Sequence, residues 1–110
     1  MAHCILFEEG TCGWNHMHVF EDLTYIGSDF NDKASSLVIL EGNWMFFIDS
    51  NLHNGLKGNV NTADYPPDAA LSVGPGIYNS ITAILGPSAS GSISSLRPVN
   101  TPAGKIELPS

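Results

Sequence analysis

Two polar hexapeptides, each followed by a short apolar run, are the feature that most constrains this chain. Residues 31–36 read Asn-Asp-Lys-Ala-Ser-Ser and precede an apolar run at 37–40. Residues 90–95 read Ser-Gly-Ser-Ile-Ser-Ser and precede a second strand-like run at 96–99. Short apolar runs that follow polar loops are typical of buried strands. Because each hexapeptide closes one half of the chain, the sequence predicts an internal repeat with a period of about fifty residues.

The composition favours a single all-β domain. A chain of 110 residues suits one core, and 43% hydrophobic residues are enough to fill it. Eleven glycines and seven prolines indicate frequent turns between short strands. This combination of short apolar runs and turn residues favours an all-β fold over mixed architectures.

Charge and cysteine content limit the classes of partner. Four basic and eleven acidic residues give a formal charge of −7, so no basic surface is expected for nucleic acid or anionic membranes. Cys4 and Cys12 are either a pair or, as we expect, two reduced thiols that pack as small apolar groups. His3 and Glu8 interrupt what would be the apolar part of a signal peptide, so we expect a cytoplasmic protein if the N-terminus is native.

The two repeats set the expected boundaries. The first repeat covers about residues 3–40 and the second about 43–99, and together they make one domain over residues 1–99. Strands are expected at residues 3–7, 17–20, 23–26, 37–40, 44–48 and 96–99, and residues 79–85 form a helical turn or a strand. Residues 55–68 are polar and rich in turn residues, so we expect a surface insertion loop, and residues 100–110 a flexible tail.

The hexapeptides resemble the double-clamp motif of the βγ-crystallin family, which runs Asn/Asp, Asn/Asp, any, any, Ser/Thr, Ser. The spacing from Phe7 to Cys12 and Gly13 resembles the family's Greek-key opening, although Cys12 replaces an aromatic residue and Trp14 a glycine. Residues 71–78 resemble a Leu-x-x-Gly-Pro-Gly-x-Tyr phrase of microbial members. The resemblance implies a sandwich of two four-stranded antiparallel sheets, built from two Greek-key motifs.

The resemblance also implies a pair of Ca²⁺ sites that share ligands between the repeats. One site would use the Ser92 carbonyl, the Ser94 hydroxyl, the Ile48 carbonyl and the crossing carboxylate of Asp32. The other would use the carbonyls of Lys33 and Glu8 and the hydroxyl of Ser35, with Gly91 at the crossing position. Glycine has no side chain to offer, so we expect one intact and one degraded calcium site.

A second interpretation of the hexapeptides remains open. Asn, Asp and Ser also stabilise turns by bonding their own backbone, without any ion.

His16 and His18 share one face of a predicted strand, and we interpret them as solvent-facing because a closed zinc site needs four ligands.

The expected function is a calcium-binding structural module that acts as a monomer. The alternative is an inhibitor-like or toxin-like module that acts through residues 55–68, where Asp64 and Asp68 could contact a ligand, with calcium binding lost. No catalytic constellation or cofactor fingerprint is found in the sequence, so we do not expect an enzyme.

Overall fold

In the computed structural model, the described residues are 1–8, 15–28, 30–58, 60, 62–87, 89 and 91–108. Strands dominate them, as the composition predicts. In chain order the elements are β1 (His3–Phe7), β2 (His16–Val19), β3 (Ser36–Glu41), β4 (Asn43–Asp49), β5 (His53–Gly55), a 3-10 turn η1 (Thr62–Asp64), β6 (Ala70–Leu71), β7 (Gly76–Tyr78), α1 (Ile81–Leu85), β8 (Ser95–Val99) and β9 (Ile106–Glu107).

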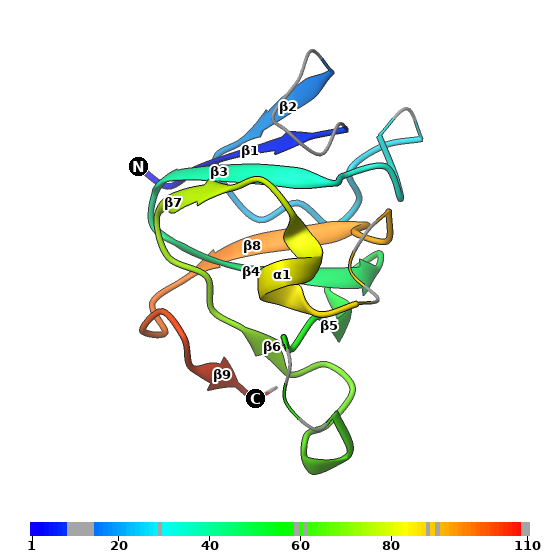
Figure 1. Cartoon of the computed structure of the whole chain (residues 1–110), viewed down its shortest axis with the longest axis vertical. Helices are drawn as coiled ribbons and strands as arrows, with labels where there is room; N and C mark the ends of the chain where they lie inside the picture. The colour runs from blue at the N-terminus through cyan, green and yellow to red at the C-terminus, as the bar shows by residue number, and fades with distance from the viewer. Residues whose placement is uncertain are drawn as a thin grey trace.

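Two antiparallel sheets face each other, and a small two-stranded sheet lies beside them (Figure 1). The first sheet has the order β2-β1-β3-β7, so three strands of the first repeat are joined by one strand of the second. The second sheet has the order β5-β4-β8, and Leu23 of the first repeat forms an isolated bridge with Leu96 of β8. Each repeat therefore contributes a segment to the other repeat's sheet, which ties the two halves into one domain.

The burial pattern of the strands follows from what covers each face. In β1, buried Cys4 and Leu6 alternate with partly exposed residues, because only one face of the first sheet meets the core. In β4, residues 44–47 are all buried. Trp44 and Phe46 join the core between the sheets, whereas Met45 and Phe47 pack on the opposite face with Ala70 of β6.

The second sheet has three strands rather than the expected four. Residues 23–26 were expected to form a strand, but only Leu23 pairs with Leu96, through N–H···O distances of 2.9 and 3.1 Å. The Thr24 carbonyl accepts instead from the Asn51 N–H at 2.7 Å. The Ile26 N–H still donates to the Ser94 carbonyl at 2.9 Å, so a single bridge and one further hydrogen bond take the place of the fourth strand.

The C-terminal segment is attached to the domain, in contrast to the flexible tail expected at residues 100–110. Strand β9 pairs with β6, and Glu107 forms an ion pair with Arg97 of β8. The Thr101 carbonyl accepts hydrogen bonds from Asn43 Nδ2 at 2.9 Å and Ser72 Oγ at 2.8 Å. Residues 100–108 therefore belong to the folded body.

Cys4 is a free thiol that lies fully buried in the core, and burial raises its pKa far above the usual value. Cys12 and Trp14, which the sequence analysis singled out, lie outside the described residues. In the described part of the chain, no helix has the length and apolar character needed to cross a membrane.

Candidate functional site

The two hexapeptides lie side by side and exchange backbone hydrogen bonds. The Asp32 N–H donates to the Ile93 carbonyl at 3.3 Å, and the Gly91 N–H donates to the Ala34 carbonyl at 3.1 Å. Asp32 and Gly91 are both the second residue of their hexapeptide, and Ala34 and Ile93 are both the fourth. The paired bonds therefore relate the two loops by an approximate two-fold axis.

Each hexapeptide is also fixed to the first strand of its own repeat. The Ser35 N–H donates to the Phe7 carbonyl at 2.8 Å, and the Ser94 N–H donates to the Phe47 carbonyl at 2.9 Å. The predicted carbonyl ligands, those of Glu8 and Ile48, belong to the residues that directly follow Phe7 and Phe47. The carbonyls of Glu8 and Ile48 therefore each follow, by one residue, a carbonyl that is hydrogen-bonded to the hexapeptide of the same repeat.

The side chains of Asp32 and Ser94 meet across the two repeats. Ser94 Oγ donates to Asp32 Oδ1 at 3.2 Å, between residues 62 positions apart. Asn31 Nδ2 donates to the other carboxylate oxygen, Asp32 Oδ2, at 3.3 Å. Ser94 is buried and Asp32 is exposed, so the contact lies at the edge of the core where solvent ions can reach it.

The loop conformation at this contact explains the residue types. Asp32 has φ 60° and Gly91 has φ 65°, so both occupy the left-handed region. Glycine enters this region freely, and aspartate and asparagine tolerate it better than other residues do. A Cβ at Gly91 would lie 3.1 Å from the Asp32 carbonyl oxygen, so the loops approach closely there. The related position predicted at Lys33, Ser35 and Glu8 has no crossing side chain, because residue 91 is glycine.

The groups at the Asp32 contact are hard oxygen donors, which fit Ca²⁺ and not the softer transition metals. Asn31 Oδ1 is buried at this site without a hydrogen-bond partner, and such an orphaned acceptor suits a cation or an ion-bound water. Among the described residues, no group of three or more His, Cys, Asp or Glu side chains could hold a metal ion. The oxygens that meet here, a carboxylate and a hydroxyl, are of the kind that calcium binds.

Other hexapeptide serines stabilise the fold. Ser95 is fully buried, and its Oγ donates to the Asp49 carbonyl at 2.6 Å and accepts from the Leu52 N–H at 3.0 Å. These two bonds hold the turn between β4 and β5. Ser92 Oγ donates to the Ala89 carbonyl at 3.0 Å. The turn-stabilising interpretation thus holds for Ser92 and Ser95, whereas the Ser94 hydroxyl points to Asp32.

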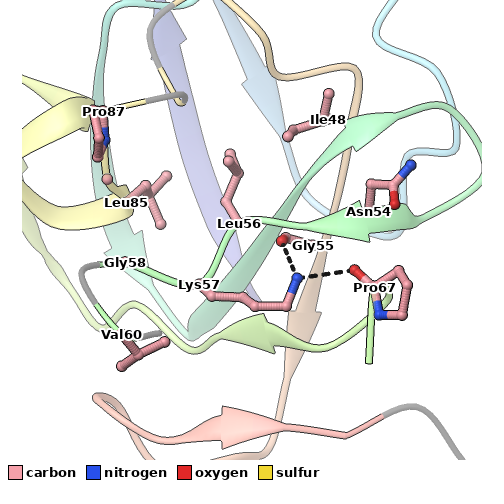
Figure 2. Close-up of a pocket in the computed structure, with 11 residues that line it drawn as sticks. Ile48, Asn54, Gly55, Leu56, Lys57, Gly58, Val60, Pro67, Leu85 and Pro87 are labelled. Atoms are coloured by element: carbon pink, nitrogen blue, oxygen red, sulfur yellow. Dashed lines mark hydrogen bonds between the residues drawn. The ribbon is translucent and has the colours of Figure 1, made fainter. Parts of the chain in front are cut away.

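Residues 55–68 combine a buried start with an exposed turn, rather than forming the surface loop that the sequence predicts. Gly55, Leu56 and Lys57 are buried because they pack between neighbouring segments: the Leu56 N–H donates to the Phe46 carbonyl, and the Gly55 N–H to the Pro67 carbonyl. A cavity of about 490 Å³ opens beside them. Figure 2 draws the residues that line it. Its walls are largely apolar and include Leu85.

Lys57 lies along one wall of this cavity. Its ammonium donates to the carbonyl oxygens of Gly55 at 2.9 Å and Pro67 at 3.0 Å (Figure 2). Burial lowers the pKa of Lys57, and the charge of Asp68 partly opposes that shift. Lys57 therefore clamps the two ends of the segment. Its burial could not be foreseen from the sequence, because nothing in the surrounding polar stretch distinguishes a buried lysine from an exposed one.

The two carboxylates considered in this segment differ. Asp68 accepts from the Asn54 N–H at 2.9 Å through Oδ1, and its Oδ2 lies 3.1 Å from His53 Nδ1. The Asn54 N–H, followed by His53, lowers the pKa of the Asp68 carboxyl. Asp64 is exposed in η1. Asp68 thus closes the segment onto β5, which is a structural role.

No protein-family model and no curated protein matches this sequence. Solved structures do match it, including the crystal structure of an archaeal βγ-crystallin, with 25% identity and a TM-score of 0.63 over 89% of this chain and 98% of that one. A βγ-crystallin from Ciona intestinalis shows 22% identity and a TM-score of 0.64, over 88% and 99% of the two chains. The fifth crystallin domain of the non-lens protein absent in melanoma 1 shows 20% identity and a TM-score of 0.63, over 92% and 90%.

Proposed function

The chain is a domain of the βγ-crystallin superfamily, and on that premise we propose that it binds one calcium ion where its two hexapeptides meet. The Asp32 carboxylate and the Ser94 hydroxyl would hold the ion, together with the carbonyls of Ser92 and Ile48. The ion would supply positive charge that joins the two repeats. The observation that carries the proposal is the contact of 3.2 Å between Asp32 and Ser94.

We expect the two related positions to differ in calcium affinity. Ligand charge and site rigidity govern calcium affinity in oxygen cages. The Asp32 position has one anionic ligand, whereas the Lys33–Ser35 position faces Gly91 and has only neutral donors. One ion is therefore expected to bind well before the other position fills.

The proposed role is to stabilise the fold. An ion that binds only the folded chain stabilises it by about 2.7 kcal/mol at a hundredfold excess over the dissociation constant. For a domain of this size, that corresponds to a rise of about 10 °C in melting temperature. We propose neither catalysis, nor a nucleic-acid or membrane partner, nor oligomerisation. Burial raises the pKa of Cys4, which makes this thiol a poor nucleophile.

Calcium titration tests this function directly. We expect calorimetry to give one Ca²⁺ per chain, and thermal unfolding to show a clearly higher midpoint in Ca²⁺ than in chelator. Mg²⁺ serves as the control, because it demands a tighter octahedral shell and loses water reluctantly. Equal midpoints in Ca²⁺ and chelator would reject the proposal. That result would favour the alternative function, in which the chain binds a partner through residues 55–68.

Gly91→Asp is expected to raise the stoichiometry from one ion to two. The change places a carboxylate at the position related to Asp32, in a conformation that aspartate tolerates. Its Cβ would lie 3.1 Å from the Asp32 carbonyl oxygen, so the loops must separate by a few tenths of an ångström. Calorimetry provides the measurement, and Gly91→Ala is the matched control with the same Cβ and no carboxylate. A folded Gly91→Asp protein that still binds one ion would contradict the predicted reason for the inequality.

A further inference from the structure

Three of the four histidines lie on the outer face of the first sheet. The register of β1 and β2 pairs Ile5 with His18 and Phe7 with His16. Because side chains alternate along a strand, His3 shares the face of Ile5 and therefore that of His18. His3 Nε2 lies 2.8 Å from His18 Nδ1, so two ring nitrogens from neighbouring strands point at one another.

Aromatic contacts hold these rings in place. The Phe20 ring stacks on His3 with centroids 4.4 Å apart, and it is nearly parallel to His18 at 6.3 Å. The His16 ring meets the edge of His18 at 5.2 Å. Rings fixed in this way lose little further freedom when they bind a ligand, so the pair is preorganised.

We propose that His3 Nε2 and His18 Nδ1 form a two-imidazole site for a borderline divalent transition metal such as Zn²⁺. Zinc with Zn–N bonds of about 2.0–2.1 Å in a tetrahedral arrangement holds two ligand nitrogens about 3.3 Å apart. The observed separation of 2.8 Å therefore has to increase by about 0.5 Å, which small ring movements provide. Water completes the shell, because the described residues contain no cluster of three such ligands.

The protons at the site balance without any other reactant. In the neutral pair, one ring donates its proton to the lone pair of the other. The metal needs both lone pairs, so the donor ring transfers this proton through water to its other nitrogen and stays neutral. Bound His3 then carries its proton on Nδ1 and bound His18 carries its proton on Nε2.

The zinc site is independent of the proposed calcium site. Its ligands are imidazole nitrogens, which suit zinc, whereas the hexapeptides offer hard oxygens, which suit calcium. The Glu41 carboxylate, near His3 in the β1–β3 register, is already ion-paired with the Met1 amine at 2.8 Å, so the charge that favours a cation is the net charge of −7 of the chain.

Calorimetry with ZnCl₂ on untagged protein, saturated with Ca²⁺, tests the proposal. We expect one zinc ion per chain, and we expect His3→Gln and His18→Gln each to weaken binding at least about tenfold. His53→Gln is the matched control, because His53 lies on β5 beside Asp68. Asp32→Gly, which removes the calcium ligand, should leave zinc affinity unchanged, so failure of either proposal is recognised separately.

Long-range ¹H–¹⁵N spectra of the histidine rings give a second readout. On addition of zinc, His3 should be bound through Nε2 and His18 through Nδ1, whereas His53 should not shift. Unchanged zinc affinity in both His3→Gln and His18→Gln would overturn the proposal. Zinc-induced shifts confined to His53 would overturn it as well.

Discussion

Asp32→Gly is expected to abolish the calcium-dependent rise in melting temperature while the calcium-free domain stays folded. The change removes the crossing carboxylate and makes the first hexapeptide equivalent to the second at this position. Glycine adopts the φ of 60° found at Asp32 without strain, so the loop is not distorted. The lost hydrogen bond from buried Ser94 costs about 1–3 kcal/mol, which a domain of about 5–15 kcal/mol total stability survives.

Two further variants separate charge at the site from charge in general. Asp32→Asn keeps an oxygen donor and the left-handed conformation but removes the negative charge, so calcium affinity should fall without vanishing. Asp64→Asn changes the net charge equally at an exposed position in η1 and should leave calcium affinity unchanged. Calorimetry and thermal unfolding, with Ca²⁺ and with chelator, provide the measurements. Undiminished calcium binding in folded Asp32→Gly would assign the hexapeptides a purely structural role.

Gly55→Ala is expected to cause a larger loss of stability than the same change at any other glycine that the structure describes. A Cβ at Gly55 would lie 2.0 Å from the Ala69 carbonyl oxygen and 2.7 Å from the Ala70 Cβ. Gly55 is fixed because it pairs with Phe47 and its N–H donates to the Pro67 carbonyl. Its neighbours are fixed as well, because the Ala69 N–H donates to the Pro66 carbonyl and Ala70 pairs with Glu107 of β9. No side-chain rotation relieves a clash with backbone, so the strands must separate, at a cost of about 3 kcal/mol or more.

Urea unfolding of Gly55→Ala and wild type measures this loss. Gly27→Ala is the control, because its Cβ would meet nothing within 4 Å. Gly27 has φ 95°, so that variant should lose about 1–3 kcal/mol from backbone strain alone. A Gly55→Ala protein that loses less than Gly27→Ala would show that β5 and the segment at Ala69 are not packed as described.

Much of the fold could be predicted because local sequence patterns encode it. The strand expected at residues 3–7 matches β1. The strand expected at 44–48 is one residue shorter than β4 at each end, and the one expected at 96–99 is one residue shorter than β8 at its start. The proximity of Asp32 and Ser94 was also anticipated, because the resemblance to βγ-crystallins implies that the two hexapeptides share ligands. Their part in holding an ion remains a prediction. Asn31, whose orphaned oxygen lies at the same site, was recognised only as part of the hexapeptide pattern.

Features that depend on packing between distant segments were not predicted. The predicted proximity of His16 and His18 is confirmed, but the neighbouring His3, which the register of β1 and β2 brings to His18, was not predicted. Residues 100–110 contain little apolar surface and were expected to fray, yet β9 finds a partner in β6. Gly55 and Lys57 are in a polar stretch but become buried, because β4 and the segment near Pro67 close over them.

The sequence by itself determined the all-β class, the internal repeat and the oxygen-rich loop at Asp32, because alternation, turn residues and ligand types are local properties of the chain. The tertiary structure alone decided which segments cross between the repeats, which glycines have no room for a methyl group and which histidines face each other. Those outcomes depend on strand register and on close contact between segments far apart in sequence, and no local pattern specifies either of them.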